Sequence, residues 1–264
     1  MKEKIQLRTP ITYYGGKQQL CSTILGLIPE HNLYCEPFCG GAAIFFGKKA
    51  SHVEVLNDTN KELINFYKVV QNDFVSLERE VRITLHSRLH HDDAYVIYNK
   101  PHLFSEIKRA WAVWVLANQS FTSILGGSWG YERKENKLST KTTSKKTAFT
   151  EELAIRLQNV QIECADACII INSRDSEDSF FYIDPPYVGS CQGHYDGYGQ
   201  DDFDKLLNTL SIIKGKFLLS SFPNDILNGF IKKNKWHTKE IVMNCSASSA
   251  GKKKTEVLTS NYVI

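Results

Sequence analysis

The sequence predicts an α/β fold with a mostly parallel sheet and helices on both faces. Two observations carry this prediction. Apolar, strand-like segments alternate with helical segments over residues 33–70, and the joins between them are short. This alternation is typical of parallel strands, which need a helical crossover between them. The same alternation resumes at Glu151, so a segment of about 80 residues divides one α/β domain into two parts.

The first part of the domain is defined by its apolar spacing. Leu20, Ile24 and Leu27 recur at helical spacing, whereas the apolar runs of the two strands are short and continuous. Asn60 precedes the third helix, where an amide side chain can cap the first turn. Helices are expected over 18–28, 42–50 and 62–70, and strands over 33–36 and 53–57.

The segment that divides the domain has two parts, which differ in their expected structure and in their composition. Residues 73–119 predict helices without an intervening strand. Residues 120–149 are rich in Gly, Ser, Thr and Lys, and they hold six basic residues and one acidic residue between Arg133 and Lys146. Because few aliphatic residues are available there to form a core, we expect this stretch to be mobile unless a partner orders it.

The second part of the domain repeats the pattern of strands and helices. The loop 188–200 contains four glycines and is a candidate lid, with a flexible surface loop as the alternative. Helices are expected over 151–158, 201–213 and 224–232, and strands over 160–163, 180–183, 217–219, 241–243 and 255–264.

Composition narrows the class of protein. Hydrophobic residues make up 42% of the chain and charged residues 23%, which is ordinary for a globular domain. No apolar run reaches the ~20 residues that cross a bilayer, and no apolar signal segment follows the N-terminus, so we expect a cytoplasmic protein. The seven cysteines form no Cys-x-x-Cys pair and lack companion histidines, so we expect reduced thiols and no metal site. The net charge of +3 is too small to identify a polyanionic partner.

The most informative motif is Asp184-Pro185-Pro186-Tyr187, which follows the apolar run 180–183. Two prolines at the end of a strand stop the sheet and fix the backbone. They hold a carboxylate, a backbone carbonyl and an aromatic ring in one small volume. The two oxygens suit the N–H groups of a planar amine, and the ring suits its face, as in the exocyclic amino group of a nucleobase. The alternative is a proline turn with an incidental Asp and Tyr.

Three further elements carry ligand-binding residue types. The segment Tyr13–Lys17 combines two glycines with a lysine, and the segment Glu36–Ala42 places a glycine turn between a strand and a helix. Asp58 ends the next strand, where an acid can bind ribose hydroxyls. Because ligands of open α/β sheets bind at the carboxyl ends of strands, we expect all four elements to meet in one crevice. Taken singly, they are also explained by a glycine turn with a solvated lysine, by helix–strand packing and by a helix cap.

In this order, the four elements resemble the Dam-like family of S-adenosylmethionine-dependent DNA adenine-N6 methyltransferases. The resemblance extends along most of the chain and is weakest in the middle. It implies a Rossmann-like catalytic domain formed by residues 1–72 and 150–264, with a target-recognition insertion at 73–149. Two positions depart from the family pattern: Tyr13 stands where many relatives have Trp, and Ala42 stands where relatives often have Gly.

The resemblance also implies roles for individual residues. Asp184 and the Pro185 carbonyl would accept hydrogen bonds from adenine N6, and Tyr187 would stack on an adenine flipped out of the duplex. The implied catalytic residues are Asp184, Pro185, Pro186 and Tyr187. The implied cofactor-binding residues are Tyr13, Lys17, Phe38, Gly40, Asp58, Asp166 and Asp184.

Double-stranded DNA is the expected partner. The basic residues between 133 and 146 suit phosphate groups, with a solvated loop as the alternative. Asn118 ends a helical stretch and is a candidate for reading a base edge, with a helix C-cap as the alternative. Trp129 and Tyr131 are candidate wedges for a flipped-base gap, and packing is the alternative for at least one of them. The candidate DNA-binding residues are Asn118, Arg133, Lys134 and Lys137.

The resemblance implies site-specific DNA methylation with S-adenosyl-L-methionine as cofactor, by a monomer or weak dimer in a bacterial cytoplasm or nucleoid, with a possible cognate restriction enzyme. Two hypotheses stay open beside it. One is a methyltransferase acting on another planar amine, such as an RNA base, cytosine N4 or a protein amide. The other is a non-catalytic DNA-binding regulator with a vestigial cofactor site. A nicotinamide or ATP enzyme fits poorly, because its glycine-rich phosphate motifs are missing.

Overall fold

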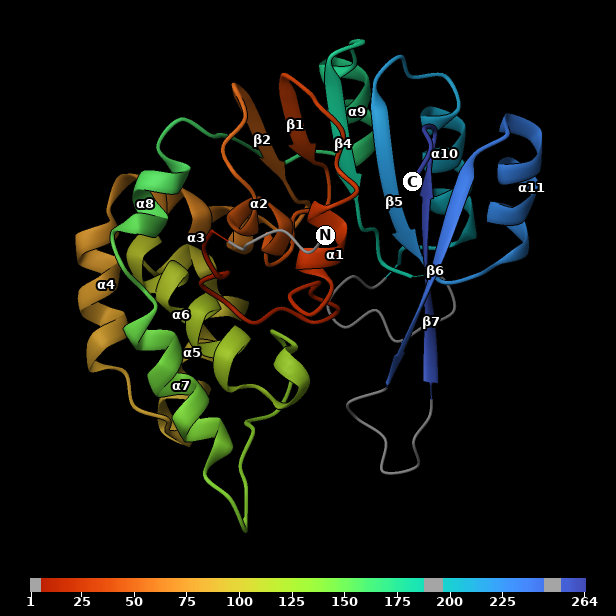
Figure 1. Ribbon diagram of the computed structural model, residues 1–264. Coiled ribbons are helices and arrows are strands. Elements are labelled where there is room, and N and C mark those ends of the chain that lie inside the picture. Colours follow the sequence, from red (N-terminus) through yellow and green to blue (C-terminus); the bar gives the residue numbers. More distant parts are fainter. Residues whose placement is uncertain (1–5, 188–196, 245–252) are drawn as a thin grey trace. The chain divides into compact units, whose positions relative to one another are not determined.

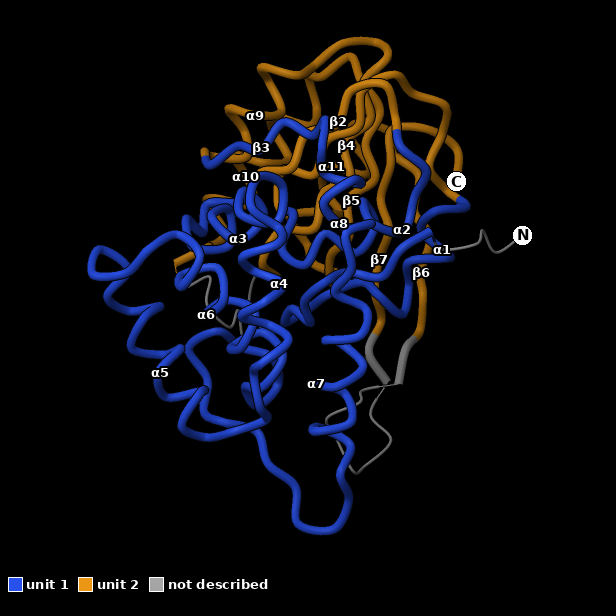
Figure 2. Tube along the Cα trace, turned by 90° about the vertical axis from the view of Figure 1, so that its left-hand side faces the viewer, with its two compact units in different colours: residues 1–26, 39–50, 58–164 blue, residues 27–38, 51–57, 165–264 orange. Residues whose placement is uncertain are grey.

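The computed structural model describes residues 6–187, 197–244 and 253–264. The chain divides into two compact units (Figure 2). Unit 1 comprises residues 1–26, 39–50 and 58–164, and unit 2 comprises residues 27–38, 51–57 and 165–264.

These units follow a different boundary from the predicted division at residues 72 and 150. The predicted insertion, 73–149, lies within unit 1 together with helix α3 (Lys61–Asn72). The physical reason is packing, because α3 packs against α6 (Glu106–Gln119) inside the same unit. The assignment of 73–149 to target recognition therefore stays a functional prediction.

The fold is α/β with a mostly parallel sheet, as the sequence predicts. Within the described residues, the strands of the sheet run in the order β3-β2-β1-β4-β5-β7-β6. In unit 2, the pairs β2–β1, β1–β4 and β4–β5 are parallel, whereas β7 pairs antiparallel with both β5 and β6 (Figure 1). The strands are β1 (Leu33–Glu36), β2 (Val53–Asn57), β3 (Gln161–Glu163), β4 (Ser179–Ile183), β5 (Lys216–Ser221), β6 (His237–Asn244) and β7 (Lys253–Ser260).

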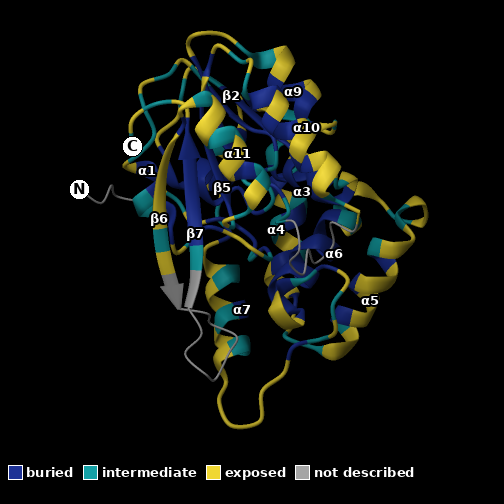
Figure 3. Cartoon of the chain, turned by 90° about the vertical axis from the view of Figure 1, so that its right-hand side faces the viewer, coloured by how far each residue is buried: buried dark blue, intermediate teal, exposed yellow. Residues whose placement is uncertain are grey.

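The core of unit 2 lies between one face of this sheet and three helices. Alternate residues of the strands, such as Phe181, Ile183, Phe217 and Leu219, join one buried apolar cluster with residues of the helices. Figure 3 shows residues 256–260 of β7 buried and residues 237–240 of β6 exposed at the edge of the sheet. The helices are α9 (Ala167–Arg174), α10 (Gln200–Leu210) and α11 (Asp225–Asn234).

Helix α9 is absent from the sequence prediction. Its apolar run Ile169-Ile170-Ile171 favours a strand by propensity, because β-branched side chains lose rotamer freedom in a helix. One local feature and one tertiary feature decide the outcome. Asp166 caps the first turn by accepting hydrogen bonds from the backbone N–H of Cys168 at 2.9 Å and of Ile169 at 3.3 Å. Ile170 and Ile171 are buried in the unit 2 core.

Unit 1 is built around α6. Residues 110–119 of this helix are buried on every side, and α6 packs against α3, α4, α5 and α7. The predicted cap of α3 is confirmed, because Asn60 Oδ1 accepts from the backbone N–H of Glu62 at 3.1 Å and of Leu63 at 3.2 Å. The other helices of unit 1 are α1 (Cys21–Leu25), α2 (Ala43–Gly47), α4 (Phe74–Ile83), α5 (Arg88–Asn99), α7 (Lys137–Thr147) and α8 (Glu152–Leu157).

The lysine-rich stretch forms a helix, which corrects the expectation of a mobile segment. Within α7, Lys145 Nζ donates to the carbonyl of Thr9 at 2.7 Å, and Lys146 Nζ donates to the carbonyl of Thr84 at 2.8 Å. Burial, together with the positive charges of Lys141 and Arg8, lowers the pKa of Lys145 to about 8. The stretch is therefore ordered by its own lysines, which bind distant backbone carbonyls.

None of the described helices combines the length and the apolar character needed to cross a bilayer.

Candidate active site

Unit 1 brings three predicted cofactor residues together around a glycine turn. The Gly40 N–H donates to Asp58 Oδ2 at 3.0 Å, so the residue after β2 holds the turn after β1. Gly40 has a φ of 46°, a left-handed conformation that favours glycine. A Cβ at Gly40 would lie 3.0 Å from Tyr13 Cδ1, and a Cβ at Gly41 would lie 3.0 Å from Tyr13 Cβ. We call Tyr13, Gly40, Gly41 and Asp58 the glycine cradle.

Asp58 holds the cradle with both carboxylate oxygens. While Oδ2 accepts from Gly40, Oδ1 accepts from the Asn60 N–H at 2.9 Å, and the residue is 2% exposed. The Tyr67 hydroxyl donates to the Gly40 carbonyl at 2.6 Å, so the backbone of Gly40 is fixed at its N–H and at its carbonyl. The helix cap proposed as the alternative role of Asp58 belongs to Asn60.

The Tyr13–Lys17 segment forms a tight turn in the same unit. Gly15 has a φ of 73°, and a Cβ at Gly16 would lie 2.9 Å from the Tyr13 carbonyl oxygen, so both positions need glycine. Lys17 is 7% exposed, and its Nζ donates to the Gly15 carbonyl at 3.0 Å. The ammonium group therefore lies against the turn and is not a solvated surface charge. Buried positive charge of this kind favours an anionic ligand group.

The structure does not support Asn118 as a base-reading residue. Asn118 is 1% exposed, and its Oδ1 accepts from the Thr12 N–H at 3.1 Å and from the Thr12 hydroxyl at 3.3 Å. Its Nδ2 donates to the Trp114 carbonyl at 2.9 Å. Both ends of the amide are thus occupied inside unit 1, where they join the end of α6 to the segment that leads into Tyr13. This prediction is corrected: Asn118 has a structural role.

The other candidate DNA-binding residues lie on the surface of unit 1. Arg133 and Lys134 are exposed in the connection before α7, and Lys137 is exposed at the start of that helix, where it forms an ion pair with Glu135. Their positions are consistent with contact to phosphate groups.

The two candidate wedge residues are stacked on each other. The rings of Trp129 and Tyr131 are 5.8 Å apart at an angle of 18°, and the Arg88 guanidinium lies 4.8 Å from the centre of the Trp129 ring. Trp129 is half-buried, whereas Tyr131 is 54% exposed. Packing, the alternative given for at least one of them, therefore applies to Trp129.

Unit 2 contains the Asp-Pro-Pro-Tyr motif, which begins directly after β4. The Tyr187 hydroxyl donates to Asp184 Oδ1 at 3.1 Å, so the first and last residues of the motif are linked. The same hydroxyl lies 2.9 Å from the Ser220 hydroxyl and is hydrogen-bonded to Glu256 Oε1. Burial, together with the negative charges of Asp184 and Glu256, raises the pKa of Tyr187 well above its usual value. Tyr187 therefore keeps its proton and is available as a donor.

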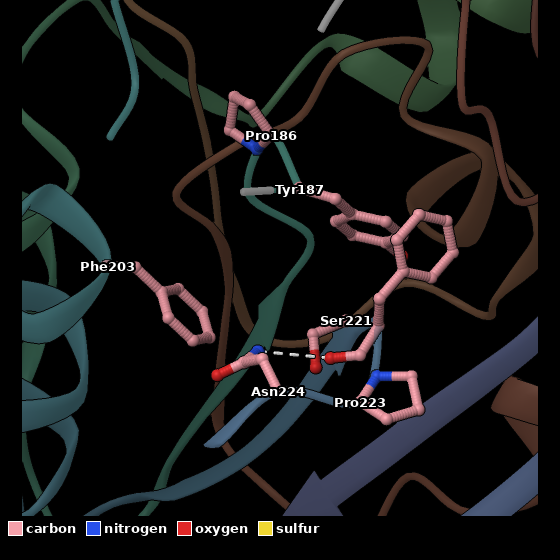
Figure 4. A pocket seen from close by; sticks show the side chains of 7 residues that line it. Pro186, Tyr187, Phe203, Ser221, Pro223 and Asn224 are labelled. Carbon is pink, nitrogen blue, oxygen red and sulfur yellow. Dashed lines mark hydrogen bonds between the residues drawn. The ribbon is translucent and has the colours of Figure 1, made fainter. Parts of the chain in front are cut away.

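A small pocket lies beside this motif (Figure 4). The rings of Tyr187 and Phe222 meet edge to face, with their centres 4.5 Å apart at an angle of 70°. Asn224 Nδ2 donates to the Phe222 carbonyl at 3.1 Å, which is the dashed contact in Figure 4. Phe222 and Asn224 are not among the predicted site residues, although their position just after β5 is a signal, because ligands bind at the carboxyl ends of parallel strands. The pocket is lined by Pro186, Tyr187, Phe203, Ser221, Phe222, Pro223 and Asn224.

Two further predicted cofactor residues, Phe38 and Asp166, are linked through Asn57. This buried amide donates to the Pro37 carbonyl at 2.8 Å and to the Ala165 carbonyl at 3.0 Å, and it accepts from the Ala165 N–H at 2.9 Å. It therefore holds the residues just before Phe38 and Asp166 together at the ends of β1 and β2. Asn57 directly precedes Asp58 in the sequence, but it is not among the predicted site residues.

The environment of Asp166 is polar. Lys205 Nζ donates to Asp166 Oδ2 at 3.1 Å. Burial opposes ionisation, but the Lys205 bond and the backbone amides of α9 outweigh it and lower the pKa of Asp166. The Phe38 ring meets Tyr198 edge to face, with their centres 6.0 Å apart.

Comparisons with known proteins identify the family. The sequence matches the model of the D12 class N6 adenine-specific DNA methyltransferases over residues 13–244. It is 27% identical over 285 residues to Type II methyltransferase M1.LlaDCHI of Lactococcus lactis subsp. cremoris, which covers 99% of this chain and 98% of that protein. It is 28% identical to Type II methyltransferase M.MjaIII of Methanocaldococcus jannaschii, over 69% of this chain and 70% of that protein.

A phage protein also matches. The DNA N-6-adenine-methyltransferase of Escherichia phage P1 is 29% identical over 207 residues, which cover 74% of this chain and 26% of the phage protein. Since the family match extends over most of the sequence, the chain belongs to the D12 class of N6 adenine-specific DNA methyltransferases and is an adenine-specific DNA methyltransferase.

Proposed function

We propose that this enzyme transfers a methyl group from S-adenosyl-L-methionine to the N6 atom of an adenine that is flipped out of double-stranded DNA. One observation carries the proposal. The Asp184-Pro185-Pro186-Tyr187 motif follows β4 directly, and its Asp and Tyr are hydrogen-bonded to each other at 3.1 Å beside a pocket with an aromatic wall. A flipped base needs acceptors for its amino group and an aromatic face, and this motif supplies both.

The protein's contribution to the reaction is positioning and charge stabilisation. Adenine N6 is a poor nucleophile, because its lone pair is delocalised into the ring. Asp184 and the Pro185 carbonyl accept the two N6–H bonds, which favours a tetrahedral nitrogen and directs its lone pair out of the ring plane. S-adenosyl-L-methionine supplies a methyl group that its sulfonium centre already activates. Binding both reactants with the reacting atoms in line lowers the entropy cost of bringing them together in the transition state.

The residues of unit 1 fit the cofactor in residue type and in shape. The glycine cradle leaves no space for a side chain at Gly40, so the Tyr13 ring packs directly against the turn and can form an aromatic wall beside the cofactor. Lys17 offers a buried positive charge for the carboxylate of the methionine moiety. The proposed cofactor residues of unit 1 are Tyr13, Lys17, Gly40 and Asp58.

Unit 2 contributes residues of a different character. Phe38 provides a ring, and the Asp166 carboxylate is ionised, which suits an adenine amino group. In this proposal, Asp184 contacts both the flipped adenine and S-adenosyl-L-methionine. The proposed cofactor residues of unit 2 are Phe38, Asp166 and Asp184.

DNA binding is assigned to the exposed basic residues Arg133, Lys134 and Lys137. Neutralising phosphates releases counterions, so DNA affinity should fall steeply with salt concentration. Because two of the relatives are Type II methyltransferases, we also propose that the enzyme belongs to a restriction-modification pair.

Methyl transfer from labelled S-adenosyl-L-methionine to mixed-sequence duplex DNA tests the proposal. Mass spectrometry of the digested DNA should find N6-methyladenine, whereas N4-methylcytosine or methylated protein would identify a different amine. Asp184→Ala should abolish transfer and leave the fold intact. Asp178→Ala is the matched control, because Asp178 is an exposed acid at the opposite end of β4. Full turnover by Asp184→Ala would overturn the role given to the motif.

A further inference from the structure

A buried acid on the last strand contacts the catalytic motif. Glu256 lies on β7 and is 1% exposed. Its Oε1 is hydrogen-bonded to the Tyr187 hydroxyl, and it accepts from the Ser220 hydroxyl at 2.6 Å. Burying a carboxylate is costly unless hydrogen bonds compensate it, so its position against this one tyrosine needs an explanation.

We propose that Glu256 is a positioning residue for methyl transfer, acting through the Tyr187 hydroxyl. This inference rests on the function proposed above. Three strands supply the groups around that hydroxyl: Asp184 follows β4, Ser220 belongs to β5 and Glu256 belongs to β7. Together they fix the plane of the Tyr187 ring, on which the flipped adenine stacks.

The number of protons shows why Glu256 affects Asp184. The Tyr187 hydroxyl has one proton, yet it contacts an oxygen of each of two carboxyl groups, Asp184 and Glu256. Ser220 donates its own proton to Glu256. Glu256 therefore competes with Asp184 for the Tyr187 proton. Removing Glu256 frees that proton for Asp184 and lets the ring rotate, so both partners of the adenine change together.

The sheet explains how the contact is held. β7 pairs antiparallel with β5, and Ser220 lies opposite Leu258 while Ser221 lies opposite Val257. Residues at the carboxyl end of β5 are therefore fixed beside residue 256. A register shift by one residue would turn Glu256 to the other face of the sheet, so the pairing itself determines the contact.

A double-mutant cycle tests the inference. Glu256→Ala and Tyr187→Phe should each lower kcat by about 10- to 100-fold, because each removes a hydrogen bond to a charged group. If Glu256 acts through the hydroxyl, Glu256→Ala should cost less than about threefold once Tyr187 is already Phe. The Michaelis constant for the cofactor should change little. Glu256→Gln keeps an amide oxygen that can accept from both Ser220 and Tyr187 in place of Glu256 Oε1, so it should restore most of the activity.

Two variants control for stability. Glu240→Ala is the matched control, because Glu240 is exposed on the neighbouring strand β6, opposite Val257, and its loss should leave kcat unchanged. Ser220→Ala removes the hydrogen bond from Ser220 to Glu256 but leaves Glu256 in place. It therefore tests the contact between Glu256 and Tyr187 even if Glu256→Ala does not fold. It should lower kcat by about tenfold.

The same double-mutant cycle is also applied to stability. The equilibrium constant of unfolding in urea is measured for each variant, and this measurement does not depend on enzyme activity. Coupling of about tenfold between Glu256→Ala and Tyr187→Phe is expected from one hydrogen bond. Additive effects in both cycles would overturn the inference. A wild-type enzyme that methylates no DNA would overturn the proposed function, whereas the folding cycle would still decide whether Glu256 holds Tyr187.

Discussion

Replacing Asp58 with asparagine should weaken the glycine cradle while preserving its shape. Asp58 accepts backbone N–H bonds from Gly40 at 3.0 Å and from Asn60 at 2.9 Å, and it is buried. A hydrogen bond to an ionised group contributes about 1.5–3 kcal/mol. Asparagine keeps one oxygen but turns its NH2 group toward the second backbone N–H. One bond is lost and one buried donor loses its acceptor, so the free energy of unfolding should fall by about 2–4 kcal/mol.

Urea unfolding followed by circular dichroism measures this loss, and titration calorimetry measures the affinity for S-adenosyl-L-methionine. We expect cofactor affinity to fall at least about tenfold, because the Gly40 peptide is no longer fixed before binding. Asp73→Asn is the matched control, since Asp73 precedes α4 and makes no capping hydrogen bond; its effect on stability should stay within about 0.5 kcal/mol. Equal stability of the two variants, with cofactor affinity unchanged, would refute the reasoning.

Three further predictions concern other residues of unit 1. Ala42 has a left-handed φ of 49°, so Ala42→Gly should raise stability by about 0.5–1 kcal/mol, seen in calorimetry as a higher Tm. The pKa of Lys145 is about 8 in the fold, against the usual lysine value of 10.5, so the unfolded chain binds more protons between these pH values. Stability relative to Lys145→Met should therefore rise from pH 8 to pH 10.5 in urea titrations, and a flat difference would contradict the burial argument. Asn118→Ala should cost about 1–3 kcal/mol through lost bonds to Thr12 and leave the DNA sequence preference unchanged in a binding assay.

The sequence was sufficient where local chemistry decides the structure. The strands around Tyr34 and Val55 and the cap at Asn60 depend on neighbouring residues, and all three are present. The Asp-Pro-Pro-Tyr motif also lies where expected, because prolines end a strand whatever surrounds them. The glycine turn at Gly40 is also predicted from local sequence, but its hydrogen bond to Asp58 is not.

The errors come from contacts between distant parts of the chain. Helix α7 lacks an apolar stripe, and it is held by lysines that bind carbonyls of Thr9 and Thr84. Asn118 is polar and ends a helix, which is typical of a surface residue, but its partner is more than a hundred positions earlier in the chain. Glu256 is not among the residues predicted from the sequence, because its contact with Tyr187 depends on the pairing of β7 with β5. Such pairing leaves no local pattern in the sequence.

The position of β7 has a consequence for how the enzyme matures during synthesis. β7 is made after every other strand of the sheet, yet it lies between β5 and β6. While the ribosome is still translating, β5 presents an unpaired edge and β6 has no neighbour to join, which is a state prone to aggregation. In the nascent protein the parallel strands can therefore pair before β7 is available, and Glu256 can reach Tyr187 only after β7 has paired with β5.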